Sequence, residues 1–180
     1  MDFDLTDEQR ALADTLDRFV ARDYGFDARR AILASPAGWS RSIWQTLADL
    51  GVLGINIPEE HGGLGYGPIE TALVMNALGR GLVLEPYLAA AVVAPELIRR
   101  AASADFQAEW LPRMAAGEAI VIAADGSRLT LDDGRLSGRL EALAHAACAD
   151  LLLVTRGDAL YAVAPAAAGM TLHDYPMLDG

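Results

Sequence analysis

The stretch that decides the fold is WQTLADLGVLGINIPEEHGGLG, residues 44–65. Apolar residues recur at helical spacing up to Gly51, which suits the left-handed position just after a helix. A short apolar run, 52–57, then stops at Pro58, and two acids, a histidine and several glycines follow. Pro68 suits the first position of another helix. The stretch therefore predicts two helices joined by a glycine-rich connection.

Those glycines admit a second interpretation, a dinucleotide-binding loop. Residues 52–57 would be the first strand, and Gly63 and Gly65 would approach a pyrophosphate. Glu85 lies at a plausible distance along the chain to bind the ribose. Pro68, however, occupies the place of the third glycine, and the two acids before the glycines would repel phosphate. We therefore favour a structural loop, in which glycine provides positive φ and close passage of the chain.

Helix signals continue through the first two thirds of the chain. Thr6 and Gln9 form a capping-box pattern, and Ser40 can cap a later helix. Pro95 is expected to break or kink the helix that contains it. The expected helices cover residues 6–25, 27–33, 40–51, 68–79, 87–102 and 106–117.

After the helices the pattern changes to short apolar runs separated by turn residues. The run 119–124 ends at an Asp-Gly pair, and the runs on either side of 132–134 and of 156–158 are typical of hairpins. The fold class is therefore α+β: an all-helical domain, 1–117, followed by a small, mostly antiparallel and incomplete β domain, 118–180. So small a sheet leaves open edges, which indicates a truncated chain or one that needs a partner.

Composition and charge narrow the functional classes. The 180 residues are 53% hydrophobic and 22% charged, so a folded core is expected. The net charge of −11 would repel nucleic acid and anionic lipid surfaces. A single cysteine, Cys148, excludes an intramolecular disulfide and fits a reducing compartment. The acidic N-terminus is unlike a targeting segment and no run is long enough to span a bilayer, so we expect a cytoplasmic protein without nucleic-acid or membrane partners.

Residues 44–65 match the pattern W-x-x-L-A-x-x-G-[ILV]-x-x-[ILV]-x-x-P-E-x-x-G-G-x-G, and in this they resemble the N-terminal helical domain of acyl-CoA dehydrogenases. The matching fixed positions are Trp44, Leu47, Ala48, Gly51, Pro58, Glu59, Gly62, Gly63 and Gly65. Segments 3–12, 106–120 and 136–156 resemble, in the same order, the family's opening helix, the helix before its flavin domain and part of that domain. The likeness extends over essentially the whole chain.

The resemblance implies a chemistry and an architecture. Acyl-CoA dehydrogenases oxidise a thioester between Cα and Cβ: a glutamate removes the α proton, and the β hydride passes to FAD. Their domains are helical, β and helical, and the third, which in most of the family brings the base and much of the FAD surface, is not represented here. We therefore assign no catalytic residue, and we expect FAD as cofactor, acyl-CoA as substrate, and a homo- or hetero-oligomer with related subunits.

Site residues are implied where the family's motifs match. Of the flavin stretch [ST]-E-P-x-x-G-S-D only Gly126-Ser127 is present, with Arg128 in place of the Asp, and residues 141–145 replace the W-[IV]-[ST] segment without its tryptophan. The implied cofactor contacts are Ala123, Ala124, Gly126, Ser127 and His145, and the implied substrate contacts are Leu84, Tyr87, Ser127 and Arg128. No metal ligand is implied.

Each of these candidates also has a plainer interpretation. Ser127 fits a turn after Asp-Gly. Arg128, Arg135 and Arg139, which would neutralise CoA phosphates, also fit an exposed strand face. Leu84 and Tyr87, which would line an acyl pocket, also fit core packing.

Two further arrangements of reactive side chains are weaker. His145 and Cys148 could form a thiol–imidazole pair, but a cysteine among alanines is usually a small core residue. His61, His145 and His173 lie far apart with no supporting cysteine pattern, so a metal site is not expected.

Three functions stay open at this point. The first, which we favour, is an FAD-dependent acyl-CoA dehydrogenase chain that carries out α,β-dehydrogenation only within an assembly. The second is a non-catalytic partner subunit of a heteromeric acyl-CoA dehydrogenase. The third is a helical interaction module without a ligand.

Overall fold

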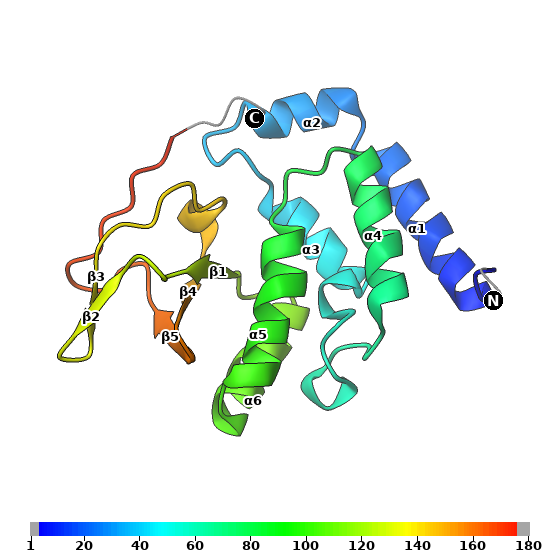
Figure 1. Ribbon diagram of the computed structural model, residues 1–180. Coiled ribbons are helices and arrows are strands. Elements are labelled where there is room, and N and C mark those ends of the chain that lie inside the picture. The colour runs from blue at the N-terminus through cyan, green and yellow to red at the C-terminus, as the bar shows by residue number, and fades with distance from the viewer. Residues whose placement is uncertain (1–3, 176–180) are drawn as a thin grey trace.

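The computed structural model describes residues 4–175, with the helices first and the strands last (Figure 1). The helical elements are α1 (Asp7–Asp23), α2 (Phe26–Leu33), α3 (Arg41–Asp49), the 3-10 turns η1 (Val52–Gly54) and η2 (Glu59–His61), α4 (Pro68–Arg80), the π-helix η3 (Leu88–Val93), α5 (Ala94–Ala101), α6 (Ala104–Ala115) and the 3-10 turn η4 (Ala146–Cys148). The strands are β1 (Val121–Asp125), β2 (Thr130–Asp132), β3 (Arg135–Ser137), β4 (Leu151–Arg156) and β5 (Ala159–Val163). The predicted α+β fold class is confirmed.

The first helix begins at the predicted capping box. Thr6 Oγ1 accepts from the Gln9 amide at 3.2 Å, and Gln9 Oε1 accepts from the Thr6 amide at 3.0 Å. The Gln9 side chain also donates to Glu70 Oε1, at 2.7 Å, and so reaches the first turn of α4. Farther along, Arg80 of α4 pairs with Asp17 of α1. The two helices therefore lie side by side and run in the same direction (Figure 1).

The decisive stretch forms helix α3, two short turns and a loop that folds back on itself. Gly51 has φ +77° directly after α3, as predicted. Residues 52–57 are not a strand: they form η1 and buried turns. A β carbon on Gly63 would lie 1.9 Å from the carbonyl oxygen of Ile57, so only glycine fits there. The dinucleotide-loop hypothesis is therefore wrong, and the structural-loop interpretation is confirmed.

The helix predicted over 87–102 divides just before Pro95. Residues Leu88–Val93 form a π-helix, and α-helical geometry begins at Ala94. The Ala94 amide donates to the Ala89 carbonyl, five residues back, and Pro95 has no amide hydrogen to donate. The break was predicted, but the π-helical geometry was not.

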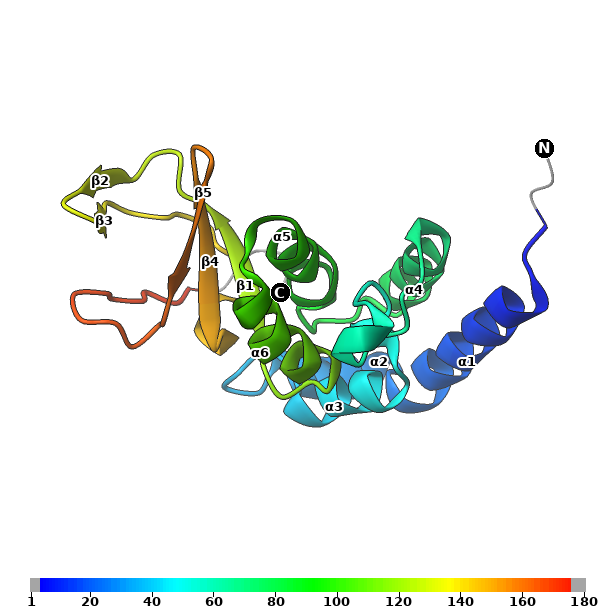
Figure 2. The ribbon, with the colours of Figure 1, turned by 90° about the horizontal axis from the view of Figure 1, so that it is seen from below.

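The strands form one three-stranded sheet and one separate hairpin. The sheet has the order β1-β4-β5, with β4 parallel to β1 and antiparallel to β5, and β2 pairs with β3 as the predicted hairpin. Two of these three pairings are antiparallel, as expected. Figure 2 shows β1 and β4 next to α5 and α6, so the helices and the sheet meet at β1.

The two faces of strand β4 pack into different parts of the core. Leu152 and Val154 join the cluster that contains Trp44 of α3, whereas Leu151 and Leu153 pack with residues of α5 and α6. Apolar contacts thus continue from the helical part into the sheet. The division into domains 1–117 and 118–180 stays a prediction.

Candidate functional site

A pocket of about 570 Å³ lies at the carboxyl end of β1, and we call it the β1 pocket. Two segments line it, one from the end of β1 and the turn after it, the other from the connection between β3 and η4. Its lining residues are Ala123, Ala124, Asp125, Ser127, Arg128, Arg139, Leu140, Glu141, Ala142 and Leu143. Small apolar side chains and charged groups therefore share one hollow.

The turn after β1 is fixed by close packing at Gly126. Its amide donates to the Thr155 carbonyl at 2.8 Å, which extends the ladder with β4 by one bond. A β carbon on Gly126 would lie 2.5 Å from a methyl group of Val154 and 2.9 Å from the Thr155 oxygen. Glycine therefore lets the chain turn tightly here, and the next residue, Ser127, reaches the pocket.

The polar groups of the β1 pocket belong to exposed side chains. Asp125 accepts two hydrogen bonds from Ser127, at 2.8 Å from its amide and 3.0 Å from its hydroxyl. Arg139 lies 3.6 Å from Glu141, and both side chains are largely exposed, so this ion pair adds little stability. Within residues 4–175, Arg128 forms no ion pair. The pocket thus carries two cations and two carboxylates.

The β1 pocket brings together part of the set implied by the resemblance. Ala123, Ala124, Ser127 and Arg128 line it, and Gly126 forms its turn. Sequence reasoning missed Asp125, although an acid two residues before a serine is a known pattern for side-chain-to-backbone bonding in turns.

His145 takes a separate position. It is exposed, has φ +62° at the start of η4, and is not among the residues that line the pocket. Its proposed contact with the cofactor stays a prediction.

Leu84 and Tyr87 are also not among the residues that line the β1 pocket. Tyr87 is 3% exposed, and its hydroxyl donates to the Val52 carbonyl at 3.2 Å. Burial raises the pKa of the Tyr87 hydroxyl. Leu84 is half-buried, and its amide donates to the Tyr24 hydroxyl at 2.9 Å. These contacts match the core-packing interpretation, and the substrate role of both residues stays a prediction.

Between these two residues lies a buried carboxylate. Glu85 is 5% exposed, and its Oε1 accepts from the Ser40 amide at 3.0 Å, just before α3. Burial raises the pKa of Glu85, while the Tyr24 hydroxyl and the Ser40 amide act in the opposite direction. Its second oxygen has no partner among the described residues. Glu85 therefore joins α3 to the segment after α4, a structural role in place of ribose binding.

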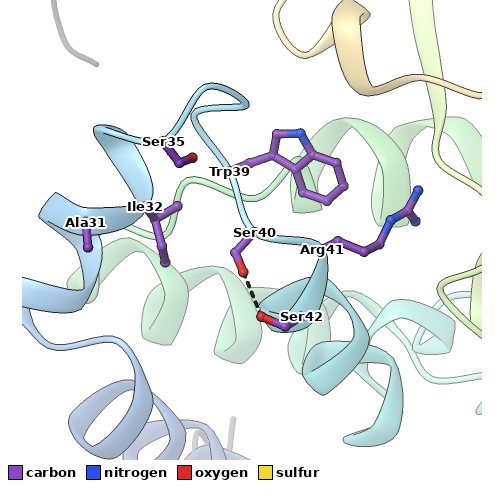
Figure 3. A pocket seen from close by; sticks show the side chains of 7 residues that line it. All are labelled: Ala31, Ile32, Ser35, Trp39, Ser40, Arg41 and Ser42. Atoms are coloured by element: carbon purple, nitrogen blue, oxygen red, sulfur yellow. Dashed lines mark hydrogen bonds between the residues drawn. The ribbon is translucent and has the colours of Figure 1, made fainter.

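A second, shallower pocket of about 440 Å³ lies between α2 and α3 (Figure 3). Ser35 and one short stretch, 39–42, supply its polar groups. The Ser40 and Ser42 hydroxyls lie 2.9 Å apart, and the Arg41 guanidinium lies 5.3 Å from the centre of the Trp39 ring. Arg41 also donates to the carbonyl of Gly117 at 3.2 Å, which ties α3 to the chain before β1. None of the site residues implied by the resemblance lies here, so the β1 pocket is the better candidate.

The thiol–imidazole pair does not form. The Cys148 thiol donates to the backbone carbonyl of His145 at 3.1 Å, not to its ring. Burial raises the pKa of Cys148 to about 11, so the thiol stays protonated at neutral pH.

Over residues 4–175, no three His, Cys, Asp or Glu side chains are grouped so as to hold a metal ion. In that same range no helix is long and apolar enough to cross a membrane.

Comparison with known proteins identifies the family. Residues 6–118 match the model of the acyl-CoA dehydrogenase N-terminal domain, and the chain therefore belongs to the acyl-CoA dehydrogenase family. Acyl-CoA dehydrogenase FadE28 of Mycobacterium tuberculosis is 30% identical over 188 residues, covering 100% of this chain and 50% of that protein. Mitochondrial isovaleryl-CoA dehydrogenase of Bos taurus is 31% identical over 118 residues, covering 64% of this chain and 28% of that protein.

Solved structures of the family share the fold. The ChsE4-ChsE5 complex from Mycobacterium tuberculosis has a TM-score of 0.83 at 28% identity, covering 94% of this chain and 50% of that chain. An acyl-CoA dehydrogenase complexed with FAD from Bacillus anthracis has a TM-score of 0.78 at 19% identity, covering 97% of this chain and 34% of that chain, and shows a likeness of fold alone. The chain thus spans 50% or less of these relatives.

Proposed function

We propose that this chain forms part of an FAD-dependent acyl-CoA dehydrogenase, and that its β1 pocket contributes to the site for flavin and acyl-CoA thioester within an assembly. The observation that carries the proposal is the convergence of Ala123, Ala124, Ser127 and Arg128 on one pocket at the end of β1. The family motifs imply contacts at these same positions. Family membership supports the reaction class, α,β-dehydrogenation of an acyl-CoA.

The residues of the β1 pocket fit part of the cofactor. The alanines and leucines of the lining offer apolar surface for a planar ring, and the arginines offer positive charge for phosphates. Strand β1 pairs with β4 along one edge, and within residues 4–175 no strand pairs with its other edge. When bound, FAD would take up the hydride released at Cβ of the substrate.

The residues of this chain would bind and orient the ligands, and would not abstract the proton. We assign them no base, and the glutamate that removes the α proton would come from another part of the assembly. Subunits of the same family are the proposed partners, in a homo- or hetero-oligomer; the ChsE4-ChsE5 structure is a complex of two named subunits. The net charge of −11 would repel nucleic acid and anionic lipid surfaces, so we infer that the chain binds neither. The single cysteine fits a reducing compartment, and we infer a cytoplasmic protein.

A second candidate function is that of a non-catalytic partner subunit. It is favoured by the Asp125–Ser127 contact, because Asp125 already takes both donors of Ser127 that would face a ligand. The missing tryptophan in 141–145 points the same way. In this alternative the chain would shape or stabilise an active homologue and bind no flavin of its own.

Flavin absorption separates the two functions. The purified chain would be scanned through the near-ultraviolet and blue, alone and after coexpression with a full-length family subunit from the same genome. We expect the coexpressed complex to bind more flavin than the full-length subunit binds alone. If the complex binds no more flavin than that subunit does alone, the non-catalytic partner function is favoured. No flavin in either sample would refute the enzymatic function.

A further inference from the structure

Two hydrogen-bond donors of the β1 pocket are already used within the chain. The amide and the hydroxyl of Ser127 both point to the Asp125 carboxylate, one to each oxygen, at 2.8 and 3.0 Å. Both residues are exposed and both line the pocket. An anionic ligand would therefore meet a pocket in which these donors already bind an anion.

We infer that Asp125 is a specificity-determining residue of the β1 pocket, whose carboxylate occupies the Ser127 donors and lowers affinity for phosphate-bearing ligands. The inference rests on the proposed function, because it concerns the same pocket. A carboxylate oxygen and a phosphate oxygen are both acceptors and need the same amide and hydroxyl donors. The ligand chemistry in question is a pyrophosphate, which FAD and coenzyme A share.

The charges around the pocket make this competition specific. Asp125 acts against an anion twice, by holding the donors of Ser127 and by like-charge repulsion. Glu141 lines the same pocket and also repels an anion, but it pairs with Arg139 and accepts no hydrogen bond from Ser127 among the described residues. Removing Glu141 tests lost repulsion together with release of the Arg139 guanidinium, and removing Asp125 tests lost repulsion together with release of the Ser127 donors.

The test is a binding comparison by isothermal titration calorimetry on the 180-residue chain, with FAD and with coenzyme A as separate probes. The variants are Asp125→Ala, Glu141→Ala, Ser127→Ala and the double variant D125A/S127A. Asp125 is exposed at the end of β1, so D125A is expected to fold, and thermal unfolding would verify this for each variant. We expect D125A to tighten binding of FAD, of coenzyme A or of both about three- to tenfold.

The gain from removing Asp125 should be smaller in the Ser127→Ala background than in the wild-type background, because Ser127→Ala removes the hydroxyl donor and keeps the backbone amide. A gain from removing Asp125 that is undiminished in the Ser127→Ala background would show that release of the hydroxyl contributes nothing, and would overturn the inference. If the wild-type chain binds FAD or coenzyme A and D125A leaves the affinity unchanged, the inference is wrong while the proposed function stands. If no variant binds either probe, alone or with the coexpressed subunit, the proposed function falls and the inference falls with it.

Discussion

Gly63 is the residue on which the decisive loop depends, because a β carbon there would lie 1.9 Å from the Ile57 carbonyl oxygen. We expect Gly63→Ala to lower the free energy of unfolding by about 2–4 kcal/mol, since backbone atoms must move apart. Gly79→Ala is the matched control, because it lies inside α4 with no atom within 4 Å of the added carbon. It should stabilise by up to about 1 kcal/mol. Urea unfolding of both variants measures this, and a G63A chain as stable as wild type would contradict it.

Glu85 makes the stability depend on pH. Its burial raises the folded-state pKa above the unfolded value, so the folded chain holds the proton more tightly. That stabilisation is complete below the unfolded pKa and is lost as the pH rises through the folded pKa. We therefore expect Glu85→Gln, which keeps an acceptor for the Ser40 amide, to become more stable relative to wild type as the pH rises above the usual titration range of a glutamate. Urea midpoints of the two proteins across this range measure the effect; a constant difference would refute it.

Local chemistry made some residues predictable and left others hidden. Thr6, Gly51 and Pro68 were placed correctly, because a cap, a left-handed glycine and a first-turn proline depend on neighbours within a few residues. The structural role of Glu85, which sequence reasoning named only within the disfavoured dinucleotide-loop interpretation, was not predicted, because its partner, the Ser40 amide, lies 45 residues away. Asp125 was missed as a site residue because the family motif has no counterpart for it.

Among the elements, the π-helix η3 shows what periodicity alone does not reveal. Apolar spacing and Pro95 predicted a helix with a break, and the structure has that break. The choice between α and π geometry depends on which carbonyl each amide reaches, and the spacing of apolar residues does not specify this. Element type was therefore predictable here, and hydrogen-bond register was not.

The pairing of α1 with α4 rests on a polar link that can be measured. Gln9 donates to Glu70 at 2.7 Å, and this bond is the main cause that lowers the pKa of Glu70. We expect a double-mutant cycle of Gln9→Ala and Glu70→Ala to give a coupling of about 0.5–1.5 kcal/mol, since both single variants lose the same bond. The coupling should fade as the pH falls through the depressed pKa of Glu70. Arg10→Ala, which removes only an exposed pair with Asp7, should change nothing measurable, and a cycle without coupling would refute the link.

For the molecule as a whole, the parallel pairing of β1 with β4 was the feature least accessible to sequence reasoning. Hairpins such as β2–β3 and β4–β5 have their signal in the turn between the strands, so they were predicted. The β1 and β4 strands are joined by a long connection that includes β2, β3 and η4, and no local signal marks their register. That connection also supplies half of the β1 pocket, for which the sequence indicated only Arg139 and the segment 141–145, whereas the half next to β1 was predicted residue by residue.

The continuous core predicts that helices and sheet unfold together. Leu152 lies in β4, is 2% exposed and shares a cluster with Trp44, whereas all three tryptophans, Trp39, Trp44 and Trp110, lie in the helical part. We expect Leu152→Ala to lower the free energy of unfolding by about 2–4 kcal/mol. The unfolding midpoint followed by tryptophan fluorescence and the midpoint followed by circular dichroism should shift by the same amount. Leu131→Ala, at a 37% exposed position in β2, should cost about 1 kcal/mol or less. A tryptophan transition left unmoved in L152A would show instead that residues 1–117 fold as an independent domain.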